Sequence, residues 1–170
     1  MNEQKPEPGP GDVNEFTKPT QQPIPAWFMP AGGLDYFTSL RADSDENESL
    51  IYNARQGEGE TLADMVGQEF DLAHFLVHQA EKELPDGEVA TLVRIVLITP
   101  DGRCLSTFSD GVMGSLKTLF GTRGLPPYAK PVRFKVATRK TGKGFKLLIL
   151  ERVFAAKPGE NGAKKAAGKP

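Results

Sequence analysis

Cysteine is nearly absent from this 170-residue chain, and a long apolar run is missing altogether. Because Cys104 is the only cysteine, the chain cannot form an internal disulfide, which favours a reducing compartment. No stretch of about 18 consecutive apolar residues occurs, so no membrane-spanning helix is expected. The N-terminus also lacks the basic start and apolar stretch of a secretory signal. We therefore expect a cytoplasmic protein that is not attached to a membrane.

Motifs of the common catalytic and cofactor sites are also missing. The two histidines, His74 and His78, have the spacing of metal ligands on a helix, but their segment has the pattern of a strand. Cys104 has no obvious histidine partner. The Gly-Lys-Gly sequence at 142–144 joins two predicted strands, whereas a phosphate-binding loop leads into a helix. The sequence therefore predicts a protein that is not an enzyme and that uses no metal or other cofactor.

Charge is unevenly distributed, although the whole chain has a net charge of only −1. Residues 1–47 carry three basic and eight acidic side chains, and residues 48–101 carry three and eleven. Residues 102–153 reverse the balance with eleven basic and two acidic side chains, and residues 154–170 carry four and one. This asymmetry indicates a polyanionic partner, unless the two halves neutralise each other within the fold.

The pattern of apolar residues predicts a β-rich domain with one helix. Residues 68–79 and 89–99 read as long strands, and a Pro-Asp-Gly turn leads into a third strand at 103–108. A helix is predicted at 111–120, where apolar residues fall on one stripe. Strands at 132–138 and 145–153 flank a tight turn at 140–144. The order β-β-β-α-β-β, with the helix between strands 3 and 4, is that of a five-stranded OB-fold barrel.

Composition divides the chain into three predicted parts. Residues 1–47, rich in proline, glycine, glutamine and acid, are expected to be disordered, residues 48–155 to form the OB-fold domain, and residues 156–170 to be a flexible basic tail. Residues 50–53 are compatible with an additional strand. Thr61 and Asp64 have the spacing of a capped helix start, which predicts a short helix at 62–66. Residues 80–88 are expected to be a charged connection with a second Pro-Asp-Gly turn.

Basic side chains are concentrated on the last two predicted strands. In residues 132–139 basic and apolar residues alternate, which places the basic ones on one outward face. Such a face would neutralise phosphates whatever the base sequence, and nearby aromatic rings would stack on unpaired bases. Two further arginines lie on the strands that form the floor of an OB groove. The predicted contacts for single-stranded DNA are Arg94, Arg103, Tyr128, Lys130, Arg133, Lys135, Arg139, Lys140, Lys143, Phe145 and Lys146.

Two of these residues, Tyr128 and Phe145, are aromatic, and alternatives stay open for Phe145 and Arg94. Tyr128 follows two prolines and precedes Lys130 in a loop, which makes it the best stacking candidate. Phe145 lies beside Lys143 and Lys146, where exposure and packing are equally compatible with the pattern. Arg94 interrupts an apolar strand, so it either pairs with an acid or faces a ligand groove.

Two blocks of sequence resemble a known family. One runs from Ile98-Thr99-Pro100-Asp101-Gly102 through Phe108-Ser109-Asp110-Gly111-Val112 to Ser115-Leu116 and Leu119-Phe120, and the other is Gly144-Phe145-Lys146-Leu147-Leu148 with Leu150-Glu151. The chain resembles, over roughly residues 60–153, the small OB-fold single-stranded DNA-binding proteins carried by phages and plasmids. The resemblance implies a protein that coats and protects single strands during replication of the phage or plasmid, without catalytic residues.

Other functions stay open on the sequence alone. The segment around Trp27 and Phe28 is aromatic within a polar extension, so it either docks on the domain or binds a partner such as a replication protein. The protein could accordingly be an interaction module of a mobile element. The same basic and aromatic residues would also serve RNA binding. An oligomer is compatible with the sequence.

Overall fold

The computed structural model describes residues 35–57 and 59–154. The predictions for Trp27 and Phe28, for residues 1–34 and for the tail 156–170 lie outside the described residues. Within the described ranges the elements are β1 (Tyr36–Thr38), α1 (Asp45–Gln56), β2 (Glu60–Thr61), the 3₁₀ helix η2 (Leu62–Met65), β3 (Glu69–Leu72), β4 (His74–Glu83), β5 (Val89–Ile98), β6 (Cys104–Thr107), α2 (Asp110–Arg123), β7 (Val132–Lys140) and β8 (Lys146–Arg152).

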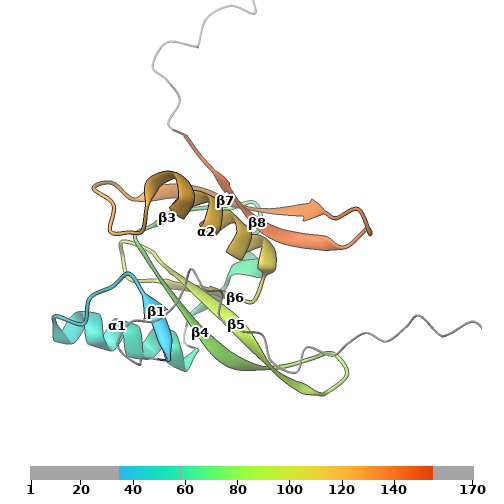
Figure 1. Ribbon diagram of the computed structural model, residues 1–170, viewed down its shortest axis with the longest axis horizontal. Helices are drawn as coiled ribbons and strands as arrows, with labels where there is room; N and C mark the ends of the chain where they lie inside the picture. Colours follow the sequence, from blue (N-terminus) through green and yellow to red (C-terminus); the bar gives the residue numbers. More distant parts are fainter. Residues whose placement is uncertain (1–34, 58, 155–170) are drawn as a thin grey trace, which may run out of the picture.

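The strands form two sheets, as Figure 1 shows. The larger has the order β1-β4-β5-β6-β2, and the smaller has the order β3-β7-β8. The predicted strand at 68–79 is divided at Ala73, where the chain passes from the smaller sheet to the larger one. Strand β4 continues to Glu83, so residues 80–83 are strand where the sequence predicted a connection. Within the larger sheet, His78 on β4 stands directly opposite Arg94 on β5.

The main core lies between the two sheets and is closed by α2. Val112, Leu116 and Leu119 are buried there, so the predicted apolar stripe of this helix is confirmed. They pack with alternate residues of β4 and β5, such as Phe75 and Ile95, which point to this side of the sheet. None of the helices within residues 35–57 and 59–154 is long and apolar enough to cross a bilayer.

A second core lies on the opposite face of the larger sheet, under α1. Ile51 and Ala54 pack there against Leu76 of β4 and Val96 of β5. Figure 1 shows α1 and α2 on opposite sides of this sheet. The strand considered at 50–53 is therefore wrong, because these residues lie within α1. The N-cap Ser44, whose hydroxyl accepts a hydrogen bond from the backbone N–H of Asn47 at 3.3 Å, starts this helix.

The prediction of a β-rich fold is confirmed, but the closed five-stranded barrel is not, because the sheets are not closed. Helix α2 covers the edge of β8, where a closing strand would pair. The hydroxyl of Ser109 donates to the carbonyl of Leu148 at 2.8 Å, and the hydroxyl of Ser115 accepts from the N–H of Leu150 at 3.1 Å. Two edge groups of β8 thus bond to side chains of α2 and its N-cap residue, and the helix occupies the place where another strand would pair.

Two other regions depart from the predicted secondary structure. Residues 62–65 form a 3₁₀ helix in place of the α-helical turn predicted at 62–66, and the side chain of Thr61 makes no capping hydrogen bond. Within the extension expected to be disordered, the structure contains β1 and the first residues of α1. Strand β1 pairs with β4, which supplies the backbone partners that an isolated three-residue strand lacks.

Candidate nucleic-acid interface

The β7–β8 hairpin carries an exposed cationic tip. Figure 1 shows this hairpin extending past the core at one side of the molecule. The turn is held by the N–H of Thr141, which donates to the carbonyl of Phe145 at 2.8 Å, and Gly144 supplies the positive φ of 84° that the reversal needs. We define the cationic tip by its exposed basic residues, which are Arg139, Lys140, Lys143 and Lys146.

Like charges face each other at this tip. Lys140 on β7 and Lys146 on β8 are direct cross-strand partners in the antiparallel ladder. Like charges in this position destabilise a sheet. Among the described residues, no carboxylate forms an ion pair with any member of the cationic tip. Phe145, 65% exposed, lies between Lys143 and Lys146 in the sequence and adds an exposed ring to the tip.

Arg133 and Lys135 lie on the outward face of β7, as the alternation predicted, but acidic residues adjoin both. The guanidinium of Arg133 donates two hydrogen bonds to the carboxylate of Asp71 on β3, at 2.9 and 3.0 Å. This contact lowers the pKa of Asp71, so the carboxylate stays charged. Lys135 stands opposite Glu69 on β3 and Glu151 on β8. This part of the basic face is therefore largely neutralised within the protein.

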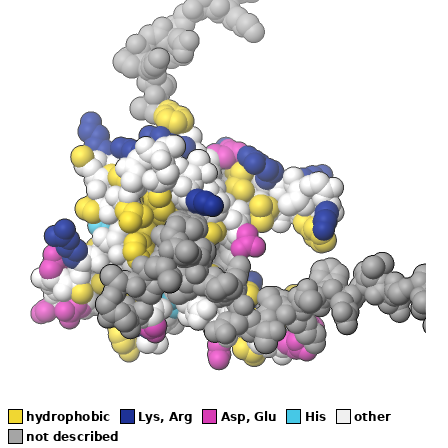
Figure 2. All heavy atoms as spheres, in the orientation of Figure 1, with side chains coloured by type: hydrophobic (Ala, Val, Ile, Leu, Met, Phe, Trp, Pro, Cys, Tyr) yellow, Lys and Arg dark blue, Asp and Glu magenta, His cyan; other side chains and the backbone are white. Residues whose placement is uncertain are grey.

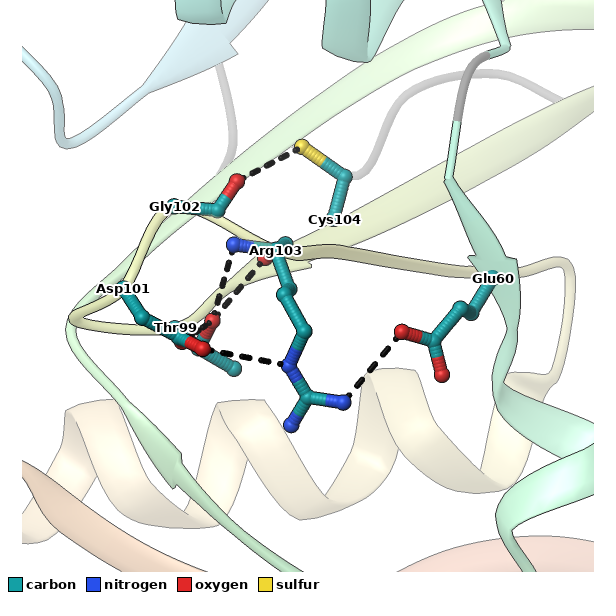
Figure 3. Close-up of polar contacts among 6 residues, drawn as sticks. All are labelled: Glu60, Thr99, Asp101, Gly102, Arg103 and Cys104. Carbon is teal, nitrogen blue, oxygen red and sulfur yellow. Dashed lines mark hydrogen bonds and ion pairs between the residues drawn. The ribbon is translucent and has the colours of Figure 1, made fainter.

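Arg103 is also held by carboxylates (Figure 3). Its guanidinium lies 3.2 Å from an oxygen of Glu60 and 3.4 Å from an oxygen of Asp101. The hydroxyl of Thr99 donates to Asp101 and thereby holds this acid in the turn between β5 and β6. Arg103 and Arg133 line one pocket of about 480 Å³, together with Asp71, Asp101 and Glu69 among others. Three acids beside two arginines make this pocket a poor site for an anion.

Arg94 is buried and serves the end of α1. Its side chain is 8% exposed, and burial lowers the pKa of its guanidinium. One guanidinium nitrogen would lie 2.9 Å from a Cβ built on Gly57, the residue that ends α1 in the left-handed conformation. A cation at this place interacts favourably with the carbonyl groups at the helix C-terminus. The structure thus gives Arg94 a structural role under α1.

Tyr128 is less available than the sequence indicated. Its hydroxyl donates to the carbonyl of Gly124 at 2.7 Å, and the guanidinium of Arg123 lies 5.0 Å from the centre of its ring. The ring is half-buried against the main core. Lys130 is exposed in the loop that precedes β7.

The structure therefore divides the predicted contact residues among separate places. Tyr128, Lys130 and Arg133 lie near the start of β7, whereas the cationic tip and Phe145 lie at its far end. Six steps along this strand, from Arg133 to Arg139, at about 3.3 Å each, separate the two groups by roughly 20 Å. Arg94 lies on β5 of the larger sheet, and Arg103 lies in the turn directly before β6. The hairpin end is the place where the structure gathers the most predicted contacts.

The two long hairpins of the molecule differ in charge. The β4–β5 hairpin extends on the same side of the molecule as β7–β8 (Figure 1). Its end exposes Glu81, Glu83, Asp86 and Glu88. Figure 2 shows acidic side chains over the lower hairpin, acidic and basic side chains together over α1, and Lys and Arg side chains toward the end of the upper hairpin. A polyanion would therefore be attracted to the cationic tip and repelled by the lower hairpin.

The sequence analysis did not predict one pocket, which polar and apolar side chains line together. It lies between α1, β1 and β4, and Arg55 and His78 line it. The sequence showed His78 only as half of a possible metal pair, and it gave no sign that a helix would cover this strand. Within the described residues no group of three or more His, Cys, Asp and Glu side chains is placed to hold a metal ion.

A protein-family model matches most of the described chain. The family model described as phage single-stranded DNA-binding protein, of the Phi29 type, matches residues 35–152. Comparison with curated proteins and with solved structures finds no match to this chain. The matched range begins at β1 and ends at β8, so it includes both sheets, both α-helices and the cationic tip. The chain belongs to the Phi29-type family of phage single-stranded DNA-binding proteins, and this supports a single-stranded DNA-binding role.

Proposed function

We propose that this protein binds single-stranded DNA largely without sequence specificity, and that the cationic tip of β7–β8 is its main phosphate contact. Lys and Arg side chains that neutralise phosphates release counterions from the nucleic acid, a gain that does not depend on the bases. Four basic residues within one hairpin end supply such a contact. In this role the protein coats and protects phage DNA during replication in the host cytoplasm, and it performs no catalysis.

One observation carries this proposal, namely the direct pairing of Lys140 with Lys146. Two ammonium groups in this position repel each other in the free protein, so the folded state is less stable than one with a neutral partner. A phosphate between or beside them removes this repulsion. The pair is therefore easier to explain as part of an anion-binding surface than as a stabilising element of the hairpin.

Phe145 is the stacking residue that the geometry favours. Its ring is exposed, whereas the ring of Tyr128 is covered by Arg123 and partly buried. Unpaired bases stack on exposed aromatic rings, and this adds about 1–3 kcal/mol per base in single-strand-binding proteins. A ring next to phosphate-binding lysines would let one nucleotide contact both. We propose that Phe145 binds a base next to the phosphates that the cationic tip binds.

Fluorescence anisotropy of a labelled oligo-dT strand tests the proposed function directly. The strand is titrated with protein at two salt concentrations, with unlabelled duplex DNA and single-stranded RNA as competitors in separate experiments. We expect binding that weakens steeply with salt and that the duplex competes for poorly. Flat titrations at low salt would refute the proposed function, and displacement by RNA at equal concentration would assign the protein to RNA binding.

A further inference from the structure

A pocket of about 630 Å³, lined by both polar and apolar side chains, lies between α1, β1 and β4. Its size is that of a pocket for a small organic group. Two tyrosines, Tyr36 and Tyr52, line it together with Arg55, Gln56 and His78. Tyr52 is 64% exposed on α1 and gives the pocket an accessible aromatic wall. Figure 1 shows α1 and the end of β7–β8 on opposite sides of the molecule, so this pocket is separate from the cationic tip.

Two buried polar atoms distinguish this pocket from the others. In the described part of the chain, only Nε2 of His78 and Nε of Arg55 are buried side-chain nitrogen or oxygen atoms without a hydrogen-bond partner. Both residues line this one pocket. His78 is 94% buried, since its exposed fraction is 6%. Leaving such buried groups unpaired destabilises the folded state, so native structures rarely contain them without a reason.

The two unpaired atoms differ in hydrogen-bonding character. Nδ1 of His78 lies 2.9 Å from the carbonyl oxygen of Gln79, which can only accept, so the proton of the neutral ring is assigned to Nδ1. Nε2 is then an acceptor. The Nε–H of Arg55 is a donor, and a terminal nitrogen of the same guanidinium already donates to Asp35 at 2.6 Å. The wall of the pocket therefore contains one acceptor and one donor that have no hydrogen-bond partner among the described residues, and both atoms are covered from solvent in the free protein.

A ligand that fits must present a donor and an acceptor on a flat body. An anion fits poorly, because the charge of Arg55 is already paired with Asp35 and Glu48 also lines the pocket. A nucleobase fits well, since its Watson–Crick edge carries donors beside acceptors and its face can stack on a tyrosine ring. We propose that this pocket binds one unpaired nucleobase, with His78 and Arg55 bonding its Watson–Crick edge and Tyr52 contacting its face.

This inference rests on the proposed DNA-binding function and adds selectivity to it. Phosphate contacts at the cationic tip attract both single-stranded and double-stranded DNA. In a duplex the Watson–Crick edges are already hydrogen-bonded and the bases are stacked, so a base enters the pocket only after it leaves the helix. A pocket that reads this edge therefore favours single strands. It would contact a different nucleotide of the strand from those bound at the cationic tip.

An abasic strand separates base contacts from phosphate contacts. We would compare the affinity of the full chain for a 30-nucleotide oligo-dT and for an abasic strand of about the same length, which keeps the phosphates and lacks the bases. The variant His78→Leu removes the acceptor and keeps an apolar side chain. His74→Leu is the matched control, because His74 lies on the same strand and the same face but outside the pocket.

We expect the wild type to bind oligo-dT more tightly than the abasic strand. His78→Leu should lower this preference roughly 10-fold and leave abasic binding unchanged, whereas His74→Leu should keep the preference. If His78 were only structural, its replacement by leucine would remove an unpaired buried group and raise the melting temperature without affecting base preference. Tyr52→Ala, at an exposed position, supplies a second variant in case His78→Leu does not fold.

The outcomes distinguish the two proposals. An unchanged base preference in His78→Leu, or in Tyr52→Ala when His78→Leu does not fold, would refute the base pocket. Equal binding of both strands by the wild type would also refute the pocket, while leaving the phosphate contact of the proposed function in place. Failure of the wild type to bind either strand would instead refute the proposed function itself.

Discussion

Removing charge at the cationic tip should reduce the salt dependence of DNA binding by a predictable amount. For single strands the slope of log affinity against log salt is about −0.7 per phosphate contacted. The double variant Lys140→Gln/Lys143→Gln removes two cations and should therefore make the slope less steep by about 1.4. When the salt concentration rises fourfold, from 50 to 200 mM, the wild type and the variant each lose affinity by some factor. The factor for the wild type should be about 7 times the factor for the variant.

A matched control separates a local contact from the effect of net charge. Arg41→Gln/Lys117→Gln removes the same charge from exposed positions outside the cationic tip, in the loop before α1 and on α2. Anisotropy titrations with oligo-dT at four salt concentrations give the slope for all three proteins. An unchanged slope in the tip variant, or an equal change in the control variant, would refute the assignment of phosphate contacts to the tip.

The same tip variant makes a prediction about stability. Because Lys140 faces Lys146, its replacement by glutamine removes a repulsion that costs about 0.2–1 kcal/mol. Thermal unfolding should therefore show a variant that is slightly more stable than the wild type. A clear loss of stability would mean that Lys140 has a structural role. Binding would then be measured with the single variant Lys143→Gln.

Further predictions concern stability and the neutralised part of the basic face. Gly111→Ala should destabilise the protein by about 1–3 kcal/mol, because the new Cβ would lie 2.3 Å from a backbone carbonyl oxygen of β8. Gly114 has open space around it, so Gly114→Ala should stabilise the protein by about 0.5–1 kcal/mol. Chemical denaturation measures the free energy of unfolding of both variants. Burial lowers the pKa of His74 and His78 below the ordinary 6.5, so the unfolded chain binds protons more readily than the folded one. The melting temperature should therefore be constant above about pH 6.5 and decrease as the pH falls below this value. The decrease should be smaller in His78→Leu. Arg133→Gln should change the salt slope little, since its guanidinium is already paired with a carboxylate; a loss as large as that of a tip residue in anisotropy would contradict this.

Local patterns predicted the elements that local forces build. The strand at β5 and the apolar stripe of α2 follow from residues close together in the sequence, and the structure confirms both. Helix α1 was missed because the acidic, proline-rich composition of residues 1–47 placed the domain boundary three residues inside it. Its signals were present, since Ser44 is a good N-cap and Gly57 a good C-terminal residue. Each of these signals is a single residue, so the composition of the long segment 1–47 outweighed them in the prediction.

The candidate site was predicted in part for a related reason. Alternation in β7 correctly placed Arg133 and Lys135 on the outside, because side-chain direction is a local property of a strand. Whether such a residue is available depends on what faces it. Asp71, which binds Arg133, lies 62 positions earlier in the chain, and the sequence alone does not pair the two. Arg94 shows the same limit, since the helix end that it serves was not predicted.

The basic residues of β7 are neutralised by acidic residues near the start of the strand and are left uncompensated at its far end. The lengths of β3 and β7 explain this difference. Strand β3 is four residues long and brings Glu69 and Asp71 beside the first four residues of β7 only. Over this overlap the acidic half of the chain neutralises the basic half. Strand β7 continues for five residues beyond it, and there its only partner among the described strands is β8, whose residues opposite Lys140 and Arg139 are Lys146 and Leu147. Charge therefore remains uncompensated at the hairpin end, where a phosphate chain can reach it, because the acidic strand ends first.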